Sequence, residues 1–396
     1  MTTVIPHQLP LLKPPRLDPL PVDVGHYVPV IQSQVGERAA LVQAPPTLWQ
    51  TVTPLVEVVG PKTVQPPLTE TRVAGWTQAV RKAVGTRPIY LDVVRLKPTL
   101  AVAGKNGQDP VLARIYVEAR KRGVRFVPVA YVGESSAAHV KMVATAALQD
   151  GYGVALRYRM RKVTPTAGKG HKELLASRLS DIGVDPGDSD LLVDLGFLEA
   201  DSEVHPEDVA DALEEMLGVA DWRCVVLLGT SIPKSLSVVT QGTVGTIPRR
   251  EWALWSALGN YRLTRIPAFG DYVIQHPDPP PEEIGAKKMM LMRANIRYTA
   301  ETETIVARGH PISQEGSEQY EDLCKQLVAR SEFAGGAYSW GDSVIDECAS
   351  GWREPGSQGL WRAAGTSHHL ELVTGQVRDL QQQRAVSAAS PDASPG

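Results

Sequence analysis

Eight short stretches rich in β-branched and other apolar residues recur along the chain, and most of the intervals between them have a helical pattern. One such interval has clear helix ends, with Thr69 as an N-cap and Gly85 just after the last turn. Strands that alternate with helices form parallel βα units. Eight units within about 250 residues predict a (β/α)8 barrel of the TIM type, with an open doubly wound sheet as the alternative. The stretches span residues 26–32, 52–59, 87–94, 125–132, 152–159, 190–196, 224–231 and 268–274.

The segments that follow the eighth stretch add to this barrel. Residues 296–309 alternate in two arms and predict a hairpin. Helices are expected at about 317–331 and 366–384, so the whole of residues 25–380 is expected to form one domain.

The two ends of the chain have a different composition. Residues 1–24 contain six prolines and predict an extended arm. Residues 385–396 are rich in Ala, Ser and Pro and predict a disordered tail.

Bulk charge and cysteine content exclude several classes of protein. The net charge of −3 gives no general attraction to nucleic acid or membrane. No apolar run approaches the roughly 20 residues that a membrane span needs, and the first residues lack the apolar core of a signal peptide. Three scattered cysteines without a CxxC pair argue against structural zinc and for a reducing compartment. We therefore expect a cytoplasmic protein that does not bind a membrane.

Strand alternation places charged side chains inside the predicted barrel. Alternate residues of a barrel strand point into the lumen, and the C-terminal strand ends carry the chemistry. This alternation points Glu57, Asp92, Arg157 and Asp194 inward, and Asp271 is a further candidate. One interpretation is a salt-bridge network inside the lumen. The other is a catalytic centre whose carboxylates hold a divalent metal or act as acid and base.

Basic residues follow several of the strands and suggest a phosphate-containing ligand, such as a nucleotide or phosphodiester. Arg159 ends the fifth strand, and Lys234 lies after the seventh in "GTSIPKS", where these barrels often bind phosphate. The alternative is that these side chains are simply solvated. The other members of this basic set are Arg95, Lys97, Lys105, Arg161, Lys162, Lys169 and His171.

The segment "GTIPRREWALW" at 245–255 predicts the start of the seventh barrel helix. Pro248 suits a first helical turn, and Trp252 and Trp255 lie on one face and are expected to pack against the barrel. Arg249 and Arg250 then lie near the barrel mouth, where one of them is expected to reach a lumen carboxylate or an anionic ligand.

Two adjacent histidines, His368 and His369, lie near the expected start of the last helix. Adjacent helical residues point about 100° apart. We therefore expect a structural role for at least one of them rather than a shared metal.

Short motifs in a fixed order resemble the beta protein family of phage-encoded and bacterial proteins. They are "YVPVIQSQVGERAAL", "VTPLVEV", "LLVDLG", "GTSIP", "IPRREWALW", "FGDY", "IRYT…ETIVARG" and "GLWRAAGTSHHLELV", spread over residues 26–378. Gln32 departs from the pattern, which has a lysine at the end of the first strand. The resemblance implies no established reaction. It implies a role in phage–host conflict, with restraint of a toxic partner as one suggested form.

Two hypotheses follow for the function. In the first, the protein is a phage or prophage beta-type protein that binds a cognate toxin or effector. In the second, it is a barrel enzyme, such as a metal-assisted hydrolase or phosphodiesterase, that acts on a phosphorylated or nucleic-acid substrate. Carboxylates close together under an open mouth favour the enzyme, whereas carboxylates each paired to an arginine favour the scaffold.

Overall fold

The fold is a closed barrel of eight parallel strands, in the order β1-β11-β9-β8-β7-β6-β3-β2. The computed structural model describes residues 22–59, 69–93, 95–96, 101–104, 107–160, 170–202, 204–278 and 292–389. The barrel strands are β1 (Tyr27–Ile31), β2 (Leu55–Glu57), β3 (Pro88–Asp92), β6 (Arg125–Tyr131), β7 (Val154–Arg159), β8 (Ser189–Phe197), β9 (Cys224–Thr230) and β11 (Ala268–Asp271). Each lies in one of the eight predicted stretches. Because β1 pairs with both β2 and β11, the sheet closes and the open-sheet alternative is wrong.

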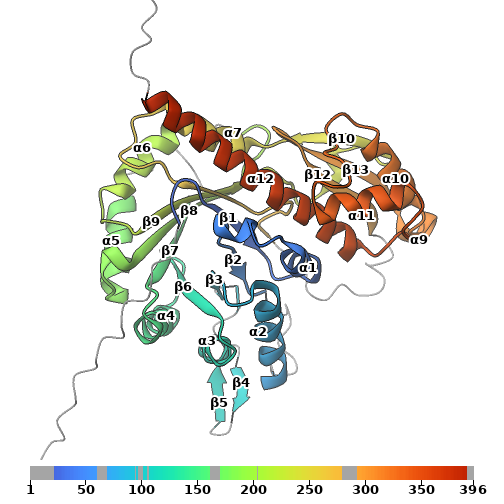
Figure 1. Cartoon of the computed structure of the whole chain (residues 1–396). Helices are drawn as coiled ribbons and strands as arrows, with labels where there is room; N and C mark the ends of the chain where they lie inside the picture. The colour runs from blue at the N-terminus through green and yellow to red at the C-terminus, as the bar shows by residue number, and fades with distance from the viewer. Residues whose placement is uncertain are drawn as a thin grey trace, which may run out of the picture.

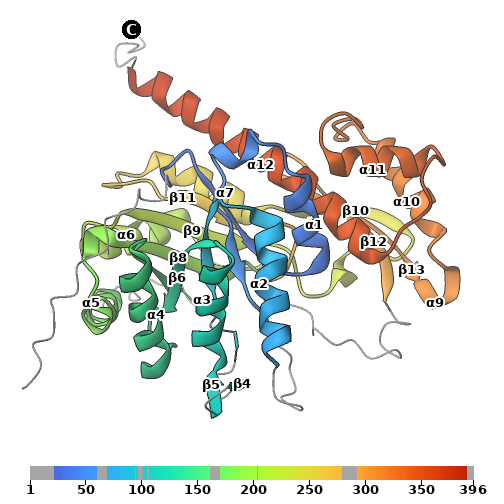
Figure 2. The ribbon, with the colours of Figure 1, turned by 60° about the horizontal axis from the view of Figure 1, so that its bottom comes forward.

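Helices surround the barrel, one after most strands (Figures 1 and 2). They are α1 (Val35–Gln43), α2 (Glu70–Val84), α3 (Val111–Lys121), α4 (Ala137–Asp150), α5 (His171–Ile182), α6 (Pro206–Leu217) and α7 (Arg250–Ala257). Thr69 caps α2 by accepting from the Arg72 backbone N–H, and Gly85 ends it at φ +64°, as predicted. α1 ends just before the Pro45–Pro46 pair, which cannot continue a helix.

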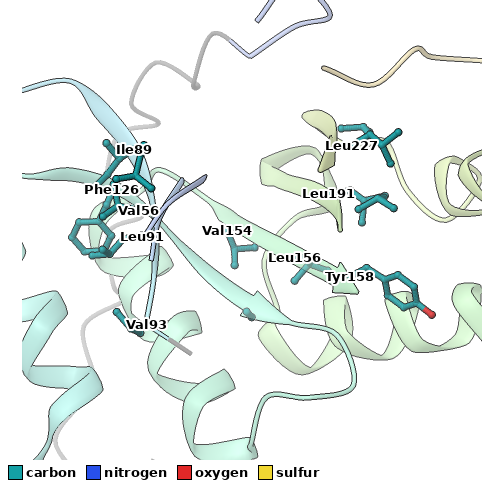
Figure 3. Close-up of a cluster of buried hydrophobic side chains, with 14 of the residues drawn as sticks. Val56, Ile89, Leu91, Val93, Phe126, Val154, Leu156, Tyr158, Leu191 and Leu227 are labelled. Atoms are coloured by element: carbon teal, nitrogen blue, oxygen red, sulfur yellow. The ribbon is translucent and has the colours of Figure 1, made fainter. Parts of the chain in front are cut away.

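Two apolar layers hold the barrel together. The outer layer packs strand residues such as Val56, Leu91 and Leu156 against the surrounding helices (Figure 3). The inner layer fills the lumen with residues such as Leu55 and Leu192. Each fully buried aliphatic side chain contributes roughly 1.5–3 kcal/mol relative to exposure. The burial of apolar residues on both faces therefore fixes which residues of each strand point into the lumen.

A C-terminal layer of sheet and helices extends the barrel. The predicted hairpin is β12 (Arg293–Thr299) and β13 (Glu303–Pro311), and β10 (Thr243–Pro248) adds a third antiparallel strand beside β13. The layer also contains α9 (Ile312–Glu315), α10 (Gln319–Val328), α11 (Trp340–Ala349) and α12 (Gln358–Ala389). A separate two-stranded hairpin, β4 (Ala101–Gly104) and β5 (Gly107–Pro110), precedes α3.

Three sequence predictions are corrected here. Pro248 is the last residue of β10, not part of a helical turn, because its strand pairs with Glu303 of β13. The last helix begins at Gln358 rather than near 366, so His368 and His369 lie well inside it. The same helix continues through residues 385–389, which were expected in the tail.

Helix α12 joins the C-terminal layer to the barrel, lying across α1, β1, β12 and α11 (Figure 2). Small residues permit the close approach. A Cβ added at Gly36 of α1 would lie 2.6 Å from the Gly359 carbonyl oxygen, and one at Gly341 of α11 would lie 2.0 Å from the Ala364 carbonyl oxygen. A side chain at either position would therefore overlap the backbone of α12, so the two glycines permit the close packing that positions the layer on the barrel.

Candidate functional site

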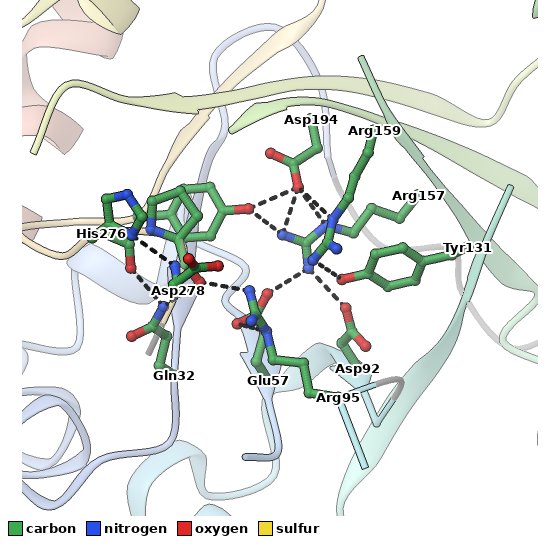
Figure 4. A network of polar contacts seen from close by, with 12 residues as sticks. Gln32, Glu57, Asp92, Arg95, Tyr131, Arg157, Arg159, Asp194, His276 and Asp278 are labelled. Carbon is green, nitrogen blue, oxygen red and sulfur yellow. Dashed lines mark hydrogen bonds and ion pairs between the residues drawn. The ribbon is translucent and has the colours of Figure 1, made fainter. Parts of the chain in front are cut away.

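Arg157 of β7 lies at the centre of a buried ion-pair network at the C-terminal ends of the barrel strands (Figure 4). Its Nη1 donates to Glu57 Oε1 of β2 and to Asp92 Oδ2 of β3, both at 2.7 Å. Its Nη2 lies 2.8 Å from Asp194 Oδ2 of β8. These are the four residues that strand alternation assigned to the lumen, and the structure brings all four together.

Two tyrosines complete the inner shell of this network. Tyr272, directly after β11, accepts from Arg157 Nη2 at 2.5 Å and donates to Asp194 Oδ2 at 2.7 Å. Tyr131 of β6 lies under the Arg157 guanidinium, which is 5.2 Å from the ring centroid. Neither tyrosine was singled out from the sequence, although strand alternation places Tyr131 inward.

The charges in this network stabilise one another. Burial alone would lower the pKa of Arg157, but the surrounding tyrosines and carboxylates outweigh it and hold the pKa well above its ordinary value. Burial would likewise raise the pKa of Asp194, but Arg157 and the Tyr272 hydroxyl hold it below its ordinary value. Both groups are therefore ionised at neutral pH.

Two further arginines form the outer edge of the network. Arg95 Nε lies 2.9 Å from Glu57 Oε2, and its Nη2 donates to the Pro277 carbonyl at 2.6 Å. Arg159 lies 3.8 Å from Asp194 Oδ2 and donates to the Tyr131 hydroxyl at 3.0 Å. Three carboxylates thus face three arginines.

The carboxylate oxygens are largely occupied by these partners. Both oxygens of Glu57 contact arginines, and Asp194 uses Oδ1 for the Gly196 backbone N–H and Oδ2 for Arg157 and Tyr272. A divalent metal needs such oxygens unpaired. Among the described residues, no group of three His, Cys, Asp or Glu side chains has an arrangement able to hold a metal ion. The geometry matches the salt-bridge interpretation of the lumen.

The remaining predicted anion-binding residues do not gather with Arg159. Lys234 pairs with Asp278 at 3.2 Å, and both side chains are mostly exposed. Arg250 is half-buried and its backbone N–H donates to Ser231 Oγ. Five more residues of the basic set, Lys97, Lys105, Arg161, Lys162 and Lys169, lie outside the described residues.

Arg249 does not reach a lumen carboxylate, contrary to one expectation. It is buried, and its Nη1 donates to the carbonyls of Ala300 and Glu301 and to Gln376 Oε1 at 2.8–3.1 Å. Burial lowers the pKa of this guanidinium. The arginine therefore joins the start of α7 to the β12–β13 turn and α12.

The tryptophans of the same segment pack as predicted. Trp255 is fully buried and donates its Nε1–H to the Pro267 carbonyl at 2.9 Å. The rings of Trp252 and Trp255 both lie 5.2 Å from the ring of Phe269.

Asp271 and His369 join the barrel to the C-terminal layer, whereas His368 bonds within that layer. Asp271 points out of the lumen, opposite to the expectation, and contacts Tyr27 and His369 at 2.5 and 2.9 Å. His368 instead contacts Asp342 of α11 at 2.9 Å and donates to the Thr299 carbonyl. The histidines thus bind different carboxylates, and both have the structural role expected for at least one.

Strained and unpaired groups gather beside the network, at the ends of β1 and β11. Ser33 and Val273 both have positive φ values, 59° and 57°, which are unfavourable for residues other than glycine. Between these strands, Gln32 is buried, and its Oε1 has no partner within the part of the chain that the structure describes. Glu37 of α1 is also buried, and burial raises its pKa to about 7. In the sequence, two features pointed to this region: the Gly-Glu pair at 36–37 within "YVPVIQSQVGERAAL" and the departure from the family pattern at Gln32.

The sequence pattern of the beta protein family matches residues 27–375, most of the chain. The chain belongs to the beta protein family. Three residues of the family's motifs, Gly36, Arg249 and His369, lie in the contacts described above between the barrel and the C-terminal layer. No curated protein matches the chain.

Solved structures resemble the protein only at low identity. A type I 3-dehydroquinate dehydratase from Clostridium difficile is 13% identical, with 66% of this chain and 87% of that chain covered and a TM-score of 0.35. A morphinone reductase variant in complex with tetrahydroNAD is 11% identical, with 62% and 82% covered and a TM-score of 0.31. Within the described ranges, no helix is both long enough and apolar enough to cross a membrane.

Proposed function

We propose that this beta-family protein acts by binding a protein partner, a toxin or effector in phage–host conflict, rather than by acid–base or metal catalysis. The observation that carries the proposal is the closed network around Arg157. In a (β/α)8 barrel the C-terminal strand ends are the usual place for reacting groups. Here the three carboxylates at that place are buried and bound to arginines, which suits a rigid scaffold better than a proton-transferring centre.

The C-terminal layer offers a surface for such a partner. Trp352, in the connection between α11 and α12, is 88% exposed. Tryptophan is enriched among the residues that dominate binding energy at protein interfaces. Its side chain makes no contribution to the buried core, so it is free to pack against a partner.

Affinity purification from cells that carry the gene tests this proposal. The wild-type chain is expected to recover one protein in stoichiometric amount, and Trp352→Ala to recover at least tenfold less. Leu148→Ala is the matched control, because Leu148 is also a large exposed apolar residue (60%) but lies on α4 of the barrel. Recovery of the chain alone under several conditions, or equal recovery by both variants, would contradict the proposal.

A second candidate is a barrel that binds or turns over an anionic, phosphate-containing substrate. It is favoured by the polarity of the network, since Arg95 and Arg159 are 17% and 26% exposed while the carboxylates they contact are 0–1% exposed. The positively charged side chains are therefore closer to solvent than the carboxylates they contact. Calorimetry with inorganic phosphate, mononucleotides and short oligonucleotides, with and without Mg²⁺ or Mn²⁺, tests it. Lack of binding at millimolar concentration would rule this candidate out.

A further inference from the structure

The loop that follows β11 is held by side chains from several elements, residue after residue. Arg297 of β12 donates to the Ile274 carbonyl and to Gln275 Oε1, the latter at 3.1 Å. Gln32 Nε2 donates to the carbonyls of His276 and Pro277 at 2.8 and 2.9 Å. The loop is thereby fixed between the end of β1 and the C-terminal layer, and Figure 4 shows its contact with Gln32.

Near this loop and the start of α1, three polar atoms that are shielded from solvent have no hydrogen-bond partner among the described residues. They are Gln32 Oε1, Glu37 Oε1 and Arg297 Nε. Leaving a buried polar group unpaired costs about 1–3 kcal/mol, so each of the three calls for a physical explanation. Contacts connect the three side chains. Gln32 and Arg297 bind consecutive residues of the same loop, and Glu37 lies close enough to Arg297 to affect its pKa.

The backbone beside these atoms is strained at two points. Ser33 directly follows Gln32, and Val273 directly precedes the fixed loop, and both have positive φ values. A β-branched residue in this region is a genuine outlier, and such strain persists mainly where ligands bind or switches operate. Strain and unpaired buried groups are independent observations that indicate the same place.

We propose that Gln32, Glu37 and Arg297 form a binding site for a small ligand that carries an amide or lactam group. A primary amide, or a lactam with an adjacent amino group, would donate one N–H to Gln32 Oε1 and another to Glu37 Oε1, and its carbonyl oxygen would accept from Arg297 Nε. A lactam with a single N–H, as in uridine, would reach only one of the two acceptors. An amide or lactam places an N–H and a C=O side by side, which supplies both kinds of partner. The site lies between barrel and C-terminal layer, and the proposal is independent of any protein partner.

The charged and polar groups around Glu37 are compatible with a ligand that carries an amide or lactam group. Arg362 of α12 donates to Gln34 Oε1 and lowers the pKa of Glu37, so it offsets part of the burial effect. The Gln34 backbone N–H also donates to Glu37 Oε2 at 3.1 Å. Oε2 of the carboxyl is thus fixed in place, whereas Oε1 has no hydrogen-bond partner of good geometry among the described residues.

Calorimetry on the full chain with nicotinamide, uridine and guanosine tests the proposal, with acetate as a probe that has no N–H donor. At least one of the three is expected to bind with 1:1 stoichiometry and Kd below 1 mM, and acetate is expected not to bind. Glu37→Gln should weaken that binding at least tenfold. The matched control is Glu173→Gln, because Glu173 has the same third position in α5 but is exposed.

A second variant keeps the test decisive if Glu37→Gln does not fold. Arg297→Lys retains the positive charge but lacks Nε, and it should weaken the binding by a similar factor. The proposal is overturned if none of the three amide or lactam probes binds at 10 mM, if acetate binds equally well, or if the folded variants bind the probe like the wild type.

Discussion

At the scale of single residues, Arg157 is the side chain that compensates the buried negative charges of the lumen. It is fully buried and contacts three buried carboxylates. Removing one partner from a buried ion pair costs about 3–5 kcal/mol, because the other charges stay buried without compensation. We expect Arg157→Met to lower the free energy of unfolding by at least that amount, measured by urea denaturation.

A combined variant serves as the control for Arg157→Met. Adding Glu57→Gln, Asp92→Asn and Asp194→Asn removes the unpaired charges, so part of the lost stability should return. If the single and combined variants were equally unstable, the loss would come from packing and the electrostatic account would be wrong.

Glu37 gives a prediction for pH dependence. Burial raises its pKa in the folded protein to about 7, against an ordinary value of 4.5, with Arg362 and the amides of Gln34 and Gln32 opposing and Glu57 adding to the rise. A carboxyl whose folded pKa is raised contributes stability below about pH 4.5, and this contribution is lost as pH rises to about 7. The wild type should therefore lose stability relative to Glu37→Gln between pH 5 and pH 8.

The expected size of this relative loss is on the order of 2–3 kcal/mol, and urea denaturation of both proteins at the two pH values measures it. Glu173→Gln is the control and should follow the wild type. Parallel pH profiles for wild type and Glu37→Gln would show that the carboxyl is not buried in the folded chain.

The sequence was informative about residues on strands and less so about residues on loops. Alternation with a period of two assigned Glu57, Asp92, Arg157 and Asp194 to one lumen, because the apolar layers on both sides enforce it. The same reasoning did not settle Asp271, which lies near a strand end. Arg297 was missed because a loop contact across many residues leaves no local pattern.

At the scale of elements, the local sequence pattern predicted helix α7 correctly but did not predict the strand that precedes it. The helix and its packed tryptophans were predicted, but β10 just before it was not. The strand "TVGTIP" is largely exposed and lacks the apolar alternation that signals a strand. It forms because β13 supplies a pairing edge, and this information lies about 60 residues away.

Arg249 holds this element to the C-terminal layer. Its Nη1 has three acceptors on the β12–β13 turn and α12, and hydrogen bonds to charged groups contribute roughly 1.5–3 kcal/mol. Arg249→Met should lower the free energy of unfolding by about this amount and speed amide hydrogen exchange at residues 300–302. Arg250→Met is the neighbouring control, with a change expected below about 0.5 kcal/mol. If both variants lowered the free energy of unfolding equally, the contacts of Arg249 would not be what holds α7 to the C-terminal layer.

At the scale of the whole molecule, the barrel and the C-terminal layer form one packed body. Polar contacts cross between them at His369 with Asp271 and Tyr27, and at Arg297 with the loop that follows β11. Both candidate functions depend on this rigidity, since a partner on the layer and a ligand at the barrel mouth would each meet a fixed surface. A single cooperative unfolding transition is the expected consequence.

Gly36 allows this cooperativity to be tested from one position. A Cβ there would lie 2.6 Å from the Gly359 carbonyl and 3.0 Å from Arg362 Cβ, so Gly36→Ala must push α12 away from α1. Overpacking of this kind costs about 1–3 kcal/mol. Gly75→Ala on α2 meets nothing within 4 Å and should instead stabilise by about 0.5–1 kcal/mol. If the two parts are coupled, Gly36→Ala will raise hydrogen exchange both in α2 of the barrel and in α10 of the layer, with one calorimetric transition at lower Tm. Exchange that rises in the layer alone, or two separate transitions, would show that α12 only tethers two independent units.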